Sequence, residues 1–93
     1  MGQYLAFDLS VLTDLRDLAG DIRKKLEGFA GEDLVSIEFL RVYTGPPLPE
    51  GKKSVSFRLT VAAHGRTLSS DEAGATRTRI IDAMQDLGYE LRV

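Results

Sequence analysis

The sequence predicts an α+β fold of the ferredoxin-like type, a β-α-β-β-α-β sandwich in which two helices cover one face of a four-stranded antiparallel sheet. Three observations favour this fold. Two segments with apolar residues at helical spacing separate segments in which apolar and polar residues alternate. A stretch rich in proline and glycine, residues 44–53, predicts a hairpin between the second and third alternating segments. The length of 93 residues suits one domain, so we expect residues 1–93 to form a single unit.

The first strand is predicted at residues 4–12, where apolar side chains at odd positions alternate with small or polar ones. The first helix is predicted to follow directly, with Thr13 or Asp14 as its N-terminal cap and Gly28 as its stop. Its acidic residues come early and its basic residues late, which suits the helix dipole. We therefore expect the basic triplet at 23–25 to be a solvated face. The expected apolar stripe consists of Leu15, Leu18, Ile22 and Leu26.

The second strand is expected to run from Val35 to about Tyr43, with Ile37 and Phe39 on the same face as Val35. The loop at 44–53 contains all three prolines and cannot be a helix or a central strand. The third strand has the clearest alternation of the chain, with apolar residues at Val55, Phe57, Leu59 and Val61.

A second helix is predicted to begin at a capping box formed by Ser69 and Glu72 and to end before Gly88. Its apolar stripe consists of Ala73, Ile80, Ile81, Met84 and Leu87. A short last strand follows, in which Tyr89, Leu91 and Val93 alternate with polar residues.

The two faces of the predicted sheet differ in chemistry. Odd-numbered residues of the first and third strands are expected to face the helices, because side chains alternate along a strand. The open face then receives Asp8, Ser10, Ser56, Arg58 and Thr60. Single-stranded RNA is often bound by aromatic rings on an open sheet face, and the third strand offers none there. We therefore do not expect bases to stack across the centre of the sheet.

Several kinds of chemistry are excluded by residues that the chain lacks. It has no cysteine and one histidine, His64, which excludes thiolate metal sites and disfavours a zinc site. We expect His64 to be an ordinary residue at a strand end. No glycine-rich phosphate cradle follows the first strand, which disfavours an acylphosphatase-like enzyme. No apolar run approaches about 18 residues, so membrane insertion is not expected. We expect no catalytic residue, no metal and no cofactor.

The charge balance limits the kind of nucleic-acid binding that the chain can support alone. Twelve Lys and Arg residues face fourteen Asp and Glu residues, for a net charge of −2. Phosphate contacts supply most non-specific affinity, so an independent RNA binder is usually basic. The balance suits a domain that adds a few local contacts to a larger enzyme.

A series of short motifs resembles a known family. From Val42 the chain reads V-Y-T-G-P-P-L-P-E-G-K-K-S-V-S-F-R-L-T-V, and R-T-L follows at Arg66 to Leu68 before an acidic helix start. Asp8 to Val11 and the closing Leu91-Arg92 extend the similarity over nearly the whole chain. This series resembles the C-terminal ferredoxin-fold anticodon-binding domain of bacterial phenylalanyl-tRNA synthetase β subunits.

The resemblance implies a non-catalytic, cytoplasmic module of protein synthesis. Its implied partners are the anticodon loop of tRNA-Phe, whose first base is a guanine, the remainder of the synthetase β subunit, and the α subunit. Tyr43 and Ser54 match family residues that contact the anticodon. Arg41 stands where the family has an Asp that can accept hydrogen bonds from guanine. Beside a bound anticodon, Arg41 can bind phosphate or stack on a base.

Three further basic residues complete the predicted tRNA-binding site. Lys52 and Lys53 at the hairpin end are within reach of phosphates if an anticodon binds there. Arg58 is expected either to contact phosphate or to pair with Asp8 across the sheet. The alternative function is a free-standing interaction or regulatory module that kept the fold and lost anticodon recognition. The acidic charge and Arg41 favour this alternative.

Overall fold

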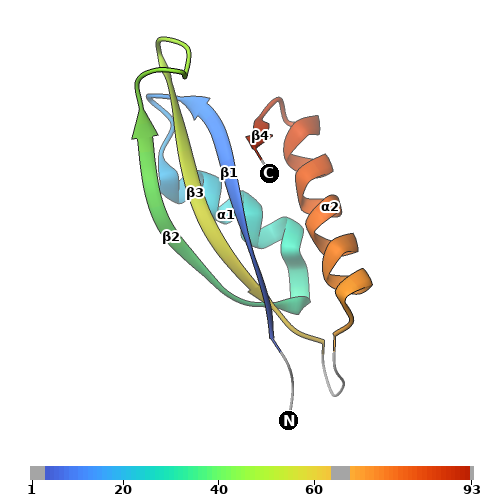
Figure 1. Ribbon diagram of the computed structural model, residues 1–93. Helices are drawn as coiled ribbons and strands as arrows, with labels where there is room; N and C mark the ends of the chain where they lie inside the picture. The colour runs from blue at the N-terminus through green and yellow to red at the C-terminus, as the bar shows by residue number, and fades with distance from the viewer. Residues whose placement is uncertain (1–3, 64–67, 93) are drawn as a thin grey trace.

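The computed structural model describes residues 4–63 and 68–92. It has the predicted β-α-β-β-α-β order and the predicted ferredoxin-like topology (Figure 1). The four strands form one antiparallel sheet in the order β2-β3-β1-β4; in Figure 1, α1 lies behind the strands and α2 runs beside β1 and β4. The elements are β1 (Leu5–Asp14), α1 (Ala19–Ala30), a 3₁₀ turn η1 (Gly31–Asp33), β2 (Leu34–Thr44), β3 (Lys52–Val61), α2 (Ser70–Asp86) and β4 (Glu90–Arg92).

The hydrophobic core lies between the sheet and the two helices. As predicted, the central strands contribute their odd-numbered residues, including Leu9, Val11 and Phe57, which are buried. Both helices cover the other side of the core with buried residues: Ile22 and Leu26 of α1, and Ile80 and Met84 of α2. Because all four strands and both helices contribute to the same cluster, helix packing fixes which face of the sheet stays open.

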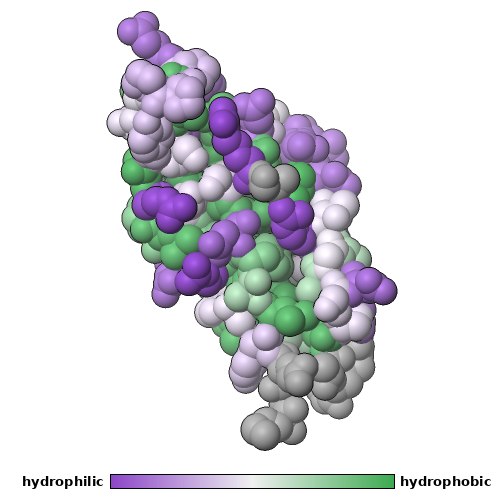
Figure 2. Space-filling view, in the orientation of Figure 1, coloured by the Kyte–Doolittle hydropathy of each residue, from purple (hydrophilic) through white to green (hydrophobic). Residues whose placement is uncertain are grey.

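The open face carries the predicted even-numbered residues. Asp8 pairs with Arg58 and Ser10 with Ser56 in the β1–β3 register, which places the members of each pair side by side. Figure 2 views this face and shows hydrophilic side chains interspersed with hydrophobic ones. Ser56 is only 5% exposed, and a hydrogen bond of 2.7 Å joins its Oγ to that of Ser10.

The predicted start of the first helix is wrong. β1 continues to Asp14, since the Leu15 backbone N–H donates to the Gly51 carbonyl at 2.9 Å and extends the sheet. The Asp14 carboxylate accepts from the Arg16 backbone N–H at 3.0 Å and forms a turn instead of a helix cap. α1 begins only at Ala19, so Leu15 and Leu18 are exposed and do not belong to the apolar stripe.

The predicted stop of this helix is also wrong. Gly28 lies within α1, which continues to Ala30 and ends at Gly31 with a φ of 70°. Arg79 of α2 stabilises this end: its guanidinium donates to the carbonyls of Phe29 at 3.3 Å and Ala30 at 3.0 Å. These carbonyls have no partner inside the helix, so the contact ties the end of α1 to α2.

The second helix agrees with its predicted signals. Ser69 and Glu72 form the expected capping box, and Gly88 follows the helix with a φ of 96°. Leu87, however, lies beyond the end of α2 and is exposed. His64 and Val93, like Arg66 and Thr67 of the R-T-L motif, lie outside the described residues.

Candidate nucleic-acid interface

Irregularities in β2 decide which of its side chains reach the open face. The register with β3 shifts between Leu34 and Ser36 and again between Phe39 and Arg41. The first shift puts Leu34 against the core, and Val35 is exposed, contrary to the prediction. The second shift inserts Leu40 as an extra residue. After it, Arg41 and Tyr43 lie on the open face instead of the face that Ile37 and Phe39 share.

The register places the candidate residues in transverse rows across the sheet. Tyr43 pairs with Ser54, and Ser54 pairs with Leu12 of β1, which in turn pairs with Glu90 of β4. Paired residues share a face, so these four side chains form one row at the hairpin end of the open face. Tyr43 and Ser54, which the resemblance assigns to anticodon contact, are therefore direct neighbours.

A second row lies next to the first, toward the centre of the sheet. It runs through Arg41, Ser56, Ser10 and Arg92. The hydrogen-bonded serine pair occupies its middle, and the two exposed arginines stand at its ends. Neither arginine forms a salt bridge within residues 4–63 and 68–92. The row therefore presents two guanidinium groups to a ligand on this face.

Tyr43 is oriented by a contact of its own. Its hydroxyl donates to the backbone carbonyl of Pro46 in the hairpin loop. The side chain remains 48% exposed and faces away from the core. This excludes a role for Tyr43 as a cap on the core and leaves part of its ring accessible on the open face.

The two lysines at the hairpin end lie on opposite faces. Lys53 pairs with Thr13, faces the helices, and donates to the backbone carbonyl of Asp17. Lys52 is exposed and lies on the open face, in the next row from that of Tyr43 toward the hairpin. The structure thus brings Lys52 together with Arg41, Tyr43 and Ser54, and separates Lys53 from them.

Arg58 lies in a third row and is paired, as one of the two predictions stated. Its Nε and Nη2 donate to the two carboxylate oxygens of Asp8 at 2.9 and 3.2 Å. Glu38 stands opposite Arg58 on β2. With one cation between two acids, this row does not add to the positive charge of the hairpin end, and Arg58 is less available for phosphate than Arg41.

The Asp8–Arg58 pair predicts a small dependence of stability on pH. Hydrogen bonding to Arg58 lowers the pKa of Asp8 below its ordinary value of 3.8. The pair therefore stabilises the fold above that ordinary value, and this contribution is lost as pH falls through the lowered pKa. Because both side chains are half-exposed, we expect Asp8→Asn to cause only a small loss of stability at about pH 7 and a smaller one at about pH 2.

Urea unfolding at both pH values, followed by circular dichroism, measures this difference. Asp82→Asn on the exposed side of α2 is the control, since Asp82 forms no salt bridge with any described residue. A loss of stability in Asp8→Asn that is the same at both pH values would show that the ion pair is not its cause.

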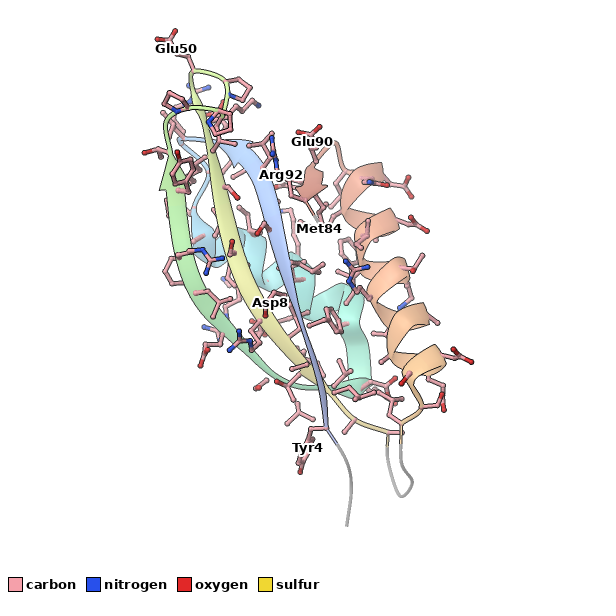
Figure 3. The ribbon with its side chains drawn as sticks, viewed as in Figure 1. Tyr4, Asp8, Glu50, Met84, Glu90 and Arg92 are labelled. Carbon is pink, nitrogen blue, oxygen red and sulfur yellow. The ribbon has the colours of Figure 1, made fainter. Side chains whose placement is uncertain are left out.

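Two residues of the site were not anticipated from the sequence. Glu90 and Arg92 lie on the open face of β4, beside the C-terminal part of β1 and toward the hairpin end of the sheet (Figure 3). The alternation expected for the last strand could have indicated this: if Leu91 faces the core, its neighbours Glu90 and Arg92 must lie on the opposite face. Within the described residues there is no cluster of three metal-binding side chains, and no helix there is long and apolar enough to span a membrane.

Comparison with known proteins shows a family and several relatives that this chain resembles. The family described as the ferredoxin-fold anticodon binding domain matches residues 3–92. A phenylalanine–tRNA ligase β subunit of Solibacter usitatus is 57% identical over 88 residues, which is 95% of this chain and 11% of that protein. β subunits from Bifidobacterium longum and Clostridium acetobutylicum are 33% and 35% identical over 91% of this chain. The chain therefore spans about a tenth of the length of these curated relatives.

Proposed function

We infer that this chain, which belongs to the ferredoxin-fold anticodon-binding domain family, binds the anticodon loop of tRNA-Phe as a module of a phenylalanine–tRNA ligase β subunit. The family is one of binding domains, so the chain is not catalytic by itself. The observation that carries the proposal is the pairing of Tyr43 with Ser54 on the open face at the hairpin end.

The chemistry of these neighbours suits an unpaired base. The accessible part of the Tyr43 ring can stack on it, and the Ser54 hydroxyl beside the ring can donate to or accept from its edge. Lys52 and Arg41 flank the pair on the same face and can contact the phosphates on either side of the base. The hydrogen bond from Tyr43 to the Pro46 carbonyl holds the ring in place before the RNA arrives.

The module is expected to work with the rest of the enzyme. A net charge of −2 gives little non-specific attraction to RNA, so most of the affinity for tRNA must come from other parts of the ligase. In this proposal residues 1–93 act as one cytoplasmic domain, attached to the remaining β subunit and assembled with the α subunit. Aminoacylation takes place elsewhere in that assembly.

Binding of a tRNA-Phe anticodon stem-loop to Tyr43→Ala tests the proposal. Loss of a stacked ring costs about 1–3 kcal/mol, so we expect the dissociation constant to rise about 5- to 150-fold. Ser54→Ala removes one hydrogen bond and should raise it about 2- to 10-fold. Tyr43→Phe keeps the ring but loses the hydrogen bond to the Pro46 carbonyl, so its dissociation constant should rise less than that of Tyr43→Ala. Fluorescence anisotropy at low and moderate salt measures each constant.

Tyr4 supplies a matched control. It is 65% exposed and lies at the far end of the molecule from the hairpin (Figure 3), so Tyr4→Ala should leave binding unchanged. If the stem-loop binds no better than an unrelated hairpin, and Tyr43→Ala has no effect, the anticodon assignment fails. The chain would then be the diverged interaction module that Arg41 and the acidic charge also suit.

A further inference from the structure

We propose that Glu90 supplies, from β4, the carboxylate that selects a guanine at this interface. The inference rests on the proposed function and extends it from the binding of an anticodon to the choice of its first base. The family's Asp position holds Arg41 in this chain, and an arginine has donors only. A guanine bound here needs its acceptor from another strand.

The register places Glu90 where such an acceptor is needed. Glu90 closes the row that begins at Tyr43 and runs through Ser54 and Leu12. Three strand spacings separate the ends of this row, about 14 Å between backbones. Tyr43 and Glu90 are exposed, whereas Ser54 and Leu12 between them are half-buried. The row therefore carries an aromatic ring at one end and a carboxylate at the other, with two less exposed side chains between them.

The chemistry of the carboxylate favours guanine. Guanine presents two adjacent donors, its ring N1–H and its 2-amino group, and an ionised carboxylate offers two acceptor oxygens. Adenine presents an acceptor at N1, so the same carboxylate can accept only from its 6-amino group and faces a repulsive lone pair. A bidentate contact therefore discriminates between two purines that stack equally well on Tyr43.

The other acids near the hairpin end are engaged or distant. Asp8 is paired with Arg58, and Asp14 accepts from the backbone and side chain of Arg16. Glu50 lies at the tip of the hairpin, beyond the row (Figure 3). Glu90 forms no salt bridge with any residue of the described ranges, which leaves its oxygens available to a ligand.

The neighbouring row offsets the repulsion between Glu90 and an RNA backbone. Arg92 lies two residues further along β4 on the same face, and Arg41 stands at the opposite end of its row. Two guanidinium groups in the row beside Tyr43 and Glu90 can hold phosphates while one carboxylate accepts from the base. Positive charge positions the strand in this arrangement, and the single acid selects the base.

Two anticodon stem-loops that differ only in the first anticodon base, guanine or adenine, test the inference. The unchanged chain should bind the guanine loop about tenfold more tightly or better. Glu90→Gln replaces one acceptor oxygen with a donor, so the two dissociation constants should converge to within about twofold. Removal of a negative charge strengthens binding to both loops alike, and the ratio of the constants cancels that effect.

Glu50→Gln is the matched control, because it removes the same charge from the same end of the molecule and should keep the guanine preference. A loop with inosine, which has the ring N–H but lacks the amino group, should bind with intermediate affinity. The inference is overturned if the unchanged chain has no guanine preference or if Glu90→Gln retains it. If binding depends on Tyr43 but the ratio of the two dissociation constants does not change in Glu90→Gln, the role of Glu90 is rejected and the proposed function stands.

Discussion

Replacement of Phe57 by alanine is expected to lower the free energy of unfolding by about 3–5 kcal/mol, the range for a large buried aromatic residue. Phe57 is 1% exposed and lies in the middle of β3, within the cluster that the helices cover. A domain of this size has a total stability of about 5–14 kcal/mol. The variant should therefore lose a large part of its stability, which urea unfolding followed by far-ultraviolet circular dichroism will measure.

Phe39 provides the internal control for this prediction. Its ring packs edge-to-face on that of Phe57, with centroids 5.9 Å apart, but it lies on the edge strand and is 49% exposed. Phe39→Ala loses the ring pair, about 0.5–1.5 kcal/mol, and only part of the burial term. Equal losses in the two variants would contradict the position of the core between β3 and the helices.

The contrast between β3 and β2 explains how much of the fold could be predicted from the sequence. β3 has neighbours on both edges and alternates without interruption, so the odd-numbered set that was predicted to face the helices is the set found there. β2 lies at the edge of the sheet and contains two register shifts. An edge strand tolerates an extra residue because one side of it has no pairing partner. Leu40 is apolar at an even-numbered position and the polar Arg41 follows at an odd-numbered one, so the alternation changes phase at the bulge. This change of phase does not by itself give the register with β3.

The same bulge limits what could be predicted of the site. Motif similarity predicted Tyr43, Ser54 and Arg41 as site residues, but only the register shows that they lie in two adjacent rows. Lys52 and Lys53 are equivalent in sequence and differ in structure, because strand alternation turns them to opposite faces. Glu90 and Arg92 join the site only through the pairing of β4 with β1, a contact between opposite ends of the chain. Local sequence patterns do not report such long-range pairing.

The ends of α1 were also predicted wrongly from the local sequence. Two glycines near its C-terminal end, Gly28 and Gly31, give a second prediction of large effect. Gly31 has φ 70° and ψ −148°, a backbone conformation close to one that is essentially confined to glycine. A Cβ at Gly31 would meet nothing within 4 Å, so backbone strain alone sets the cost of an alanine there. Gly31→Ala is expected to lower the free energy of unfolding by about 1–3 kcal/mol.

Gly28 is the matched control because it belongs to the same helix and its Cβ would also meet nothing within 4 Å. Its backbone is helical, and alanine has the higher helix propensity, so Gly28→Ala should raise the free energy of unfolding by about 0.5–1 kcal/mol. The same chemical change thus has opposite signs at positions three residues apart. If α1 ended at Gly28, as its sequence suggests, Gly28→Ala would be the destabilising variant. Urea unfolding of the two variants therefore locates the end of the helix.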